Sequence, residues 1–217
     1  MILNSIFLHL DGRYFSSEIC LKLKDQSRHI TYRIQRALKE EKFSTDGFNR
    51  IVIEPSEKAT NEIFINSSSV ANISVDFDIE KFNKLTDEEL ENYYISMIKN
   101  GLKNFNEKIQ IPVCSMLNTI DDLEKNDFID FWIYKEKQSK KLKLSAKLIC
   151  KMDRKEFTLS LVIEKNESTI FNKDILKTPP DEISFHYKFK DLIINENFVE
   201  VTARIPQDEI LARVPIS

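Results

Sequence analysis

Glycine is scarce in this chain of 217 residues: only three occur, where average usage gives about fifteen. The glycine-rich loops that bind phosphate in P-loop and Rossmann proteins need several glycines at short spacing, and no such loop is present. The G-x-S-x-G nucleophile motif and the H-E-x-x-H zinc motif are also missing. These absences exclude the enzymes that a short motif identifies. An enzyme whose site is assembled only by folding stays open as an alternative.

Cysteine and histidine are equally sparse, with three of each, and no two cysteines form a C-x-x-C pair. The wide spacing predicts neither a disulfide framework nor a zinc site. We therefore expect no metal and no cofactor. A nucleophilic pair of Cys114 with a histidine is an alternative that no local motif supports.

Long apolar runs are absent too. No stretch reaches the roughly 20 apolar residues that a membrane-spanning helix needs. The first residues, MILNSIFLHLDGRYF, have only a short apolar run with no basic residue before it, which is not typical of a signal peptide. We expect a cytoplasmic protein. A net charge of −3 argues against a dedicated nucleic-acid binder, and 41% hydrophobic residues predict a folded core.

The spacing of apolar residues predicts an N-terminal half of mixed strands and helices. A hairpin is expected from strands at 2–10 and 18–23. Helices are expected after Ser27, after Thr86, where Thr86 and Glu89 form a capping box, and after Pro112. Short strands are expected at 50–54, 62–66 and 70–78.

The C-terminal half changes to a two-residue rhythm, in which lysines alternate with apolar residues over 141–152 and a partner strand follows at 157–163. Further strands are expected at 128–135, 168–175, 183–189 and 198–205. The whole pattern predicts an α+β fold, with antiparallel sheets, a few packed helices and a C-terminal β-meander. We expect a single α+β domain over 1–217, with possible lobes at 1–126 and 127–217.

Basic residues are concentrated between Lys135 and Lys155, with nine of them against two acidic residues. Such a segment has two interpretations. It is a cationic face that binds a polyanion or an acidic partner, or it is the solvated side of a sheet whose lysines protect an edge. A structural or adaptor protein that uses this basic sheet is the alternative function that the segment suggests.

The sequence also contains two clusters of acidic residues. The cluster over 76–91 is partly explained by a helix N-terminus, which favours negative charge. The cluster over 121–130 lies where a helix ends, and acids there interact unfavourably with the helix dipole. It leads into a tryptophan, and acids beside an aromatic residue form an anchor for a basic partner; a solvated turn before a core strand is the other interpretation. The candidate partner-binding residues are Asp121, Asp122, Glu124, Asp127, Asp130 and Trp132.

The segment from Val75 to Leu90, VDFDIEKFNKLTDEEL, continues through Tyr93 and Tyr94 to Leu102. This run of about 30 residues resembles small cytoplasmic immunity proteins of bacterial polymorphic-toxin and contact-dependent inhibition systems. The resemblance implies a protein that acts by binding, without catalytic residues, and that neutralises a cognate toxin domain. It also implies that the toxin is often a basic nuclease, blocked by an acidic surface.

Overall fold

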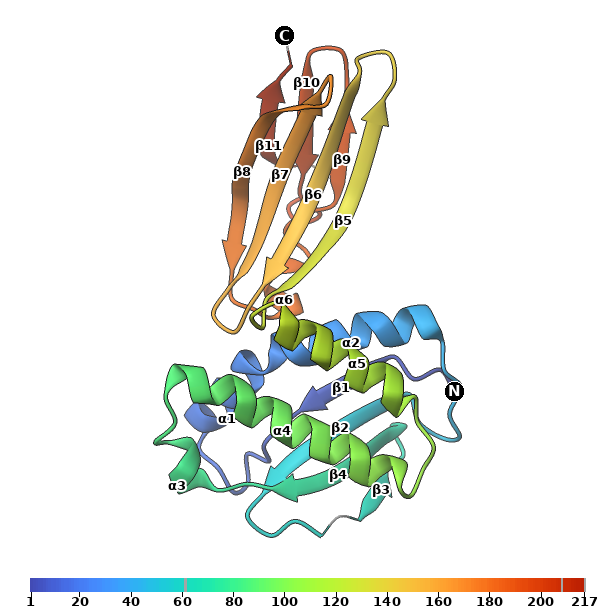
Figure 1. Cartoon of the computed structure of the whole chain (residues 1–217), viewed down its shortest axis with the longest axis vertical. Helices are drawn as coiled ribbons and strands as arrows, with labels where there is room; N and C mark the ends of the chain where they lie inside the picture. Colours follow the sequence, from blue (N-terminus) through green and yellow to red (C-terminus); the bar gives the residue numbers. More distant parts are fainter. Residues whose placement is uncertain (61, 208, 217) are drawn as a thin grey trace. The chain divides into compact units, whose positions relative to one another are not determined.

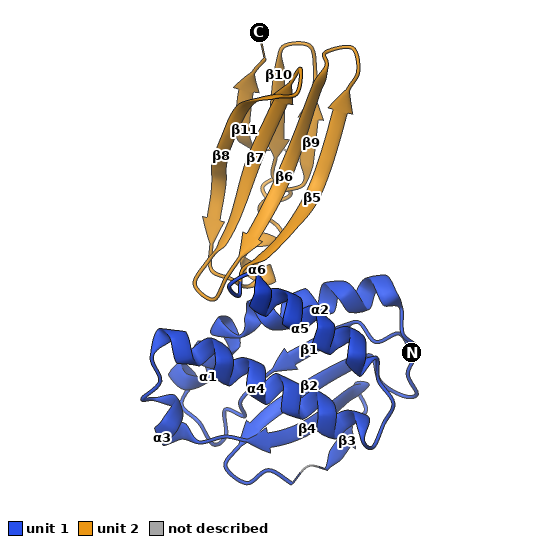
Figure 2. Ribbon diagram, in the orientation of Figure 1, with its two compact units in different colours: residues 1–128 blue, residues 129–217 orange. Residues whose placement is uncertain are grey.

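The chain divides into two compact units, unit 1 over Met1–Phe128 and unit 2 over Ile129–Ser217 (Figure 2). The computed structural model describes residues 1–60, 62–207 and 209–216. The division falls two residues after the expected lobe boundary at 126. Over the described residues the chain forms six helices and eleven strands (Figure 1), and the α+β class predicted from the sequence is confirmed.

Unit 1 is a four-stranded sheet with helices packed on one of its faces (Figure 1). Its strands are β1 (Ser5–Leu8), β2 (Arg50–Ser56), β3 (Ile63–Ile65) and β4 (Val70–Asp76). Its helices are α1 (Ser17–Gln26), α2 (Arg28–Glu41), α3 (Ile79–Phe82), α4 (Asp87–Asn106) and α5 (Val113–Lys125). The strand order is β1-β2-β4-β3.

The sheet of unit 1 is mixed. Strands β1, β2 and β4 run parallel, and only β3 pairs antiparallel, with β4. Alternate residues of β2 and β4, such as Ile51, Ile53 and Ile73, are buried on the helix side, while their neighbours stay partly exposed. The core therefore lies between the sheet and the helices, and the opposite face of the sheet carries no helix among the described residues.

The predicted N-terminal hairpin is wrong. Residues 18–23 belong to helix α1, whose Ser16 side chain caps it by accepting a hydrogen bond from the backbone N–H of Ile19. Because two helices then connect β1 to β2, the two strands pair in parallel. The three predicted helices of this half are confirmed as α2, α4 and α5. The capping box of Thr86 and Glu89 is present in α4.

Unit 2 consists of two antiparallel sheets that pack face to face (Figure 1). The first has the order β5-β6-β7-β8, and the second has the order β11-β10-β9. The strands are β5 (Asp130–Ser139), β6 (Leu144–Met152), β7 (Phe157–Lys165), β8 (Ser168–Thr178), β9 (Asp191–Ile194), β10 (Phe198–Thr202) and β11 (Ile210–Pro215). The predicted C-terminal meander is therefore confirmed.

The core of unit 2 follows the predicted alternation. Leu148 and Leu161 pair across β6 and β7 and are fully buried, as is Val201 of β10. One prediction fails here: residues 183–189 are not a strand, and the first three of them belong to helix α6 (Glu182–Phe185). Phe185 from this helix stacks on Phe157 of β7, with 3.8 Å between ring centroids.

Candidate functional site

The predicted acidic cluster is divided between the two units. Its first four residues lie on helix α5 and in the turn after it, in unit 1. Asp130 and Trp132 lie in β5 of unit 2. The four acids Asp121, Asp122, Glu124 and Asp127 are described together below as the α5 acidic cluster.

The α5 acidic cluster is held by a lysine from the neighbouring helix. The Lys99 ammonium on α4 lies 2.9 Å from Asp121 Oδ1 and 2.8 Å from Glu124 Oε2. Residues three positions apart lie on nearly the same face of a helix, so one ammonium group can reach both carboxylates. The unfavourable position of acids at a helix C-terminus is thus partly compensated by a cation from α4.

The ion pair between Lys99 and Asp121 shifts the pKa of both groups. The hydrogen bond from Lys99 lowers the pKa of Asp121 below its ordinary value. Burial alone would lower the pKa of Lys99, but its hydrogen bonds to Asp121 and Glu124 outweigh burial and raise it. At neutral pH both partners are therefore charged.

The cluster keeps exposed negative charge despite Lys99. The side chains of Asp121 and Asp122 are 50% and 58% exposed. Lys125, one turn further along α5, lies 3.2 Å from Asp122. Against the four carboxylates of the cluster, the ammonium groups of Lys99 and Lys125 supply two positive charges, which leaves an excess of two negative charges. Asp127 is exposed at the end of the helix, where its backbone adopts a positive φ of 52°.

Trp132 packs within unit 2. Its ring centroid lies 5.9 Å from that of Phe157 and 6.5 Å from that of Phe185. The side chain therefore contributes to the aromatic core at this end of the sandwich, which agrees with the alternative interpretation of a core strand. Asp130, at the start of the same strand, is opposite Met152 in the register of β5 and β6.

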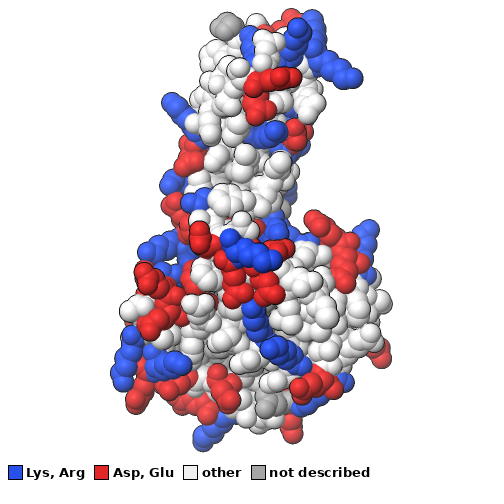
Figure 3. Space-filling view, viewed as in Figure 1, with Lys and Arg blue, Asp and Glu red and all other residues white. Residues whose placement is uncertain are grey.

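At least four of the nine basic residues of the basic segment of unit 2 form ion pairs with carboxylates. Lys147 lies 3.6 Å from Glu164 and 3.9 Å from Glu136, and Lys151 lies 4.0 Å from Asp153. Lys135 and Lys141 form ion pairs with Asp191 and Glu196 respectively. Most of these acids lie outside the basic segment in sequence, so only folding brings them to it. Figure 3 shows acidic and basic side chains intermixed on the visible face of unit 2.

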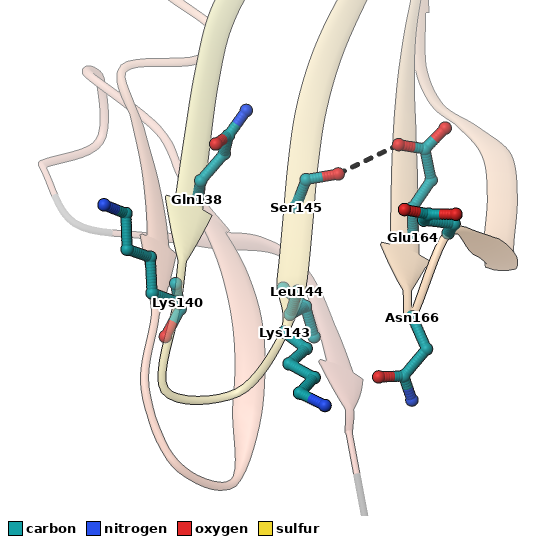
Figure 4. A pocket seen from close by; sticks show the side chains of 9 residues that line it. Gln138, Lys140, Lys143, Leu144, Ser145, Glu164 and Asn166 are labelled. Atoms are coloured by element: carbon teal, nitrogen blue, oxygen red, sulfur yellow. Dashed lines mark hydrogen bonds between the residues drawn. The ribbon is translucent and has the colours of Figure 1, made fainter.

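A shallow hollow of about 660 Å³ lies at the hairpin ends of the four-stranded sheet. Figure 4 shows Gln138, Ser145 and Glu164 side by side on three neighbouring strands, with Lys140, Lys143 and Asn166 on the loops. The Ser145 hydroxyl donates a hydrogen bond to Glu164 at 2.9 Å, so the Glu164 carboxylate already has a partner. This hollow has the mixed polarity of a solvated sheet surface.

The cysteine and histidine candidates are not brought together at the hollow beside Cys114. Cys114 is exposed at the second residue of α5, in a hollow of about 520 Å³ whose described lining contains no histidine. His29 is buried in unit 1, with its Nε2 3.1 Å from Glu91 Oε2. Within the described residues, no group of three or more metal-ligating side chains occurs.

Comparisons with family models, curated proteins and solved structures found no match to this chain. No helix in the part of the chain that the structure describes is long and apolar enough to cross a membrane.

Sequence reasoning missed Lys99 as a member of the acidic site. Lys99 lies 22 positions before Asp121, on a different helix. It falls on the polar side of α4, where a lysine is typical of any amphipathic helix. Only the packing of α4 against α5 identifies it as the partner of these acids.

Proposed function

We propose that this chain is a bacterial cytoplasmic binding protein that neutralises a cognate toxin domain by forming a stoichiometric complex with it. The observation that carries the proposal is the pair of half-exposed carboxylates, Asp121 and Asp122, on the α5 acidic cluster. The resemblance of residues 75–102 to immunity proteins supports the same function.

The electrostatics of the cluster suit a cationic partner. The lowered pKa of Asp121 keeps that carboxylate charged well below neutral pH. A surface of negative charge attracts a basic protein over distances of about 8 Å at physiological salt, and so raises the association rate. The active site of a nuclease is basic because it binds phosphates, so such a toxin would be attracted to this acidic surface. The cluster would cover that site and exclude the nucleic acid.

The site of binding is proposed on unit 1 alone. The α5 acidic cluster belongs wholly to this unit, and its geometry is set by α4 and α5, which pack against each other. Trp132 is left out of the contact because its ring packs on Phe157 and Phe185. Asp130 is left out with it, since both residues lie in unit 2.

The test is co-expression with any toxin-like protein that a neighbouring gene encodes. A tag on one protein should recover both in equal amounts at physiological salt, and the complex should suppress the activity of the toxin. Recovery of this chain alone, with the toxin fully active in its presence, would overturn the proposal.

A further inference from the structure

Strand β3 forms an unprotected edge of the unit 1 sheet. It lies at the end of the strand order, and Figure 1 shows it beside β4 at the rim of the sheet. Edge strands are normally shielded by charges, proline, bulges or a covering segment, because their free backbone groups pair readily with another strand. The residues of β3 are Ile63, Phe64 and Ile65, so none is charged and none is proline.

The opposite edge of the same sheet is protected. Strand β1 lies there, and the Gln35 side chain of α2 donates a hydrogen bond to the carbonyl of Ile6 at 2.8 Å. In unit 2, edge strand β5 has a register shift between Ile133 and Lys135 and carries lysines beyond it. In contrast to these two edges, β3 carries no charged residue, and no side chain among the described residues is hydrogen-bonded to its outer backbone groups.

The register of β3 shows which backbone groups are free. The N–H of Asn66 donates to the carbonyl of Val70 where the two strands join. Hydrogen-bonded and non-hydrogen-bonded pairs alternate in an antiparallel ladder, so Phe64, opposite Asn72, is the next hydrogen-bonded residue. The N–H and C=O groups of Ile63 and Ile65 therefore point away from β4, and no described residue is a hydrogen-bond partner for them.

The side chains at this edge are also exposed. Phe64 is 66% exposed and Ile65 38% exposed. Phe64 shares a face with Asn72 and Val52, because these residues are in register across β3, β4 and β2. No helix of the described part of the chain covers that face, so an added strand would find both free backbone groups and an apolar side chain beside them.

We propose that β3 is a strand-addition site, which takes an extended apolar segment of another protein. The free groups of Ile63 and Ile65 would bond its backbone, and Phe64 would contact one of its apolar side chains. A second copy of this chain is a poor occupant, because three paired residues bury far less than the roughly 1,200 Å² of a stable interface. A foreign segment is free to extend over the open face of the sheet. This site goes beyond the proposed function, since it does not involve the α5 acidic cluster.

The test uses a synthetic peptide with the sequence of β4, VANISVD, since β4 is the strand with which β3 already pairs. At about 1 mM peptide, amide hydrogen exchange followed by NMR should slow about tenfold or more at Ile63 and Ile65. Exchange at Phe64, which already bonds to β4, should not change. Unchanged exchange at Ile63 and Ile65 would overturn the proposal.

Two controls separate backbone pairing from nonspecific contact. Ile65→Pro removes an outward N–H and keeps the ladder between Phe64 and Asn72, so the peptide should bind about tenfold more weakly. Ile65→Val keeps that N–H and should bind within about twofold of the wild type. Equal binding by the proline variant would contradict the proposal.

A peptide control covers the case in which Ile65→Pro fails to fold. Two peptides are compared, one N-methylated at the odd-numbered positions and the other at the even-numbered positions. One of them should no longer bind the wild-type chain, and the other should bind as before. Loss of binding by both peptides, or by neither, would contradict strand addition. A wild-type dimer that Ile65→Pro dissociates would overturn the assignment to a foreign segment. The double variant Asp121→Lys with Asp122→Lys should leave peptide binding unchanged. The strand-addition proposal and the toxin-binding proposal can therefore be contradicted independently.

Discussion

The ammonium of Lys99 on α4 lies 2.9 Å from the carboxylate of Asp121 on α5, and the same ammonium reaches Glu124 at 2.8 Å. This cation joins two helices and neutralises part of the negative charge of the α5 acidic cluster. The pair therefore matters both for the stability of unit 1 and for the surface proposed to meet the partner.

Replacing Lys99 by Gln should lower the free energy of unfolding by at most about 1 kcal/mol at neutral pH, because the pair is partly exposed and screened by solvent. The contribution of Asp121, whose pKa is lowered in the fold, is present above the ordinary carboxyl pKa of about 4 and is lost as pH falls through its folded value. The contribution of Lys99, whose pKa is raised, is present below about 10.4 and is lost as pH rises through its folded value.

Urea unfolding of wild type and Lys99→Gln at several pH values measures this difference. It should be largest between about pH 5 and 9 and should shrink toward pH 2. Lys125→Gln is the matched control, because its pair with Asp122 is more exposed and should contribute less. A difference independent of pH would show that Lys99 acts by packing rather than by charge.

Gly101→Ala should destabilise unit 1. Ala is favoured over Gly inside a helix by about 1 kcal/mol, but a Cβ at position 101 would lie 2.8 Å from the side chain of Ile53. Ile53 is fully buried on β2, so overpacking should cost about 1–3 kcal/mol and outweigh the helix preference. Thermal unfolding measures the net effect. Combination with Ile53→Ala should relieve part of the loss, and strict additivity of the two changes would contradict the predicted clash.

Thr86→Ala should lower stability by about 1 kcal/mol, since the side chain caps α4. Glu89 completes the box by accepting a hydrogen bond from the Thr86 backbone N–H, and this bond lowers the pKa of Glu89. The capping contribution of Glu89 should thus be present above about pH 4.3 and fade as pH falls through its folded pKa. Chemical unfolding of Thr86→Ala and Thr86→Ser compares the two; an equal loss in both would show that the hydroxyl is not the cap.

The lysine-rich segment of unit 2 should bind DNA poorly. Lys147 and Lys151 each lie within 4.0 Å of a carboxylate, and Lys135 and Lys141 are also ion-paired, so less positive charge is available for phosphates than the sequence alone indicates. Fluorescence anisotropy with a short labelled duplex at physiological salt should give a Kd weaker than about 10⁻⁴ M, the weak end of nonspecific binding. Micromolar binding that Lys147→Ala weakens would contradict this interpretation and favour the basic surface.

The sequence predicted elements whose signals are local. The helix after Thr86 has a capping box and five turns of regular spacing, and α4 begins and runs as expected. The alternation of lysine and apolar residues over 141–152 likewise gave strand β6, since one side is wet and the other buried.

The failures involve short segments in which both periodicities fit. Ile19, Leu21 and Leu23 alternate as in a strand, yet they lie in α1, where Leu21 is 54% exposed. Ser16 as an N-cap was the signal that could have identified this helix. In the same way Asp181 caps α6, in a segment that was expected to be a strand. Short apolar runs do not distinguish helix from strand by pattern alone.

The candidate site was predictable only as a list of acids. The sequence places Asp121, Asp122 and Glu124 on one helical turn, and the structure keeps them together. The expected lobe boundary at 126 also separates Asp130 from these acids, and the structure places the division at 128. The sequence does not reveal that Lys99 neutralises part of the group. That pairing depends on a contact between residues 22 positions apart in sequence, which no local pattern encodes.

The most direct test of the central claim is the association rate of the chain with a toxin-like partner recovered by that co-expression, measured by stopped-flow fluorescence at low and physiological salt. The double variant Asp121→Lys with Asp122→Lys should associate about tenfold more slowly than wild type at low salt, and the difference should shrink at higher salt. Glu107→Lys, a change of an exposed acid elsewhere on unit 1, should stay within about twofold. Equal rates for wild type and the double variant, or an equal loss in the control, would contradict the proposed role of the α5 acidic cluster.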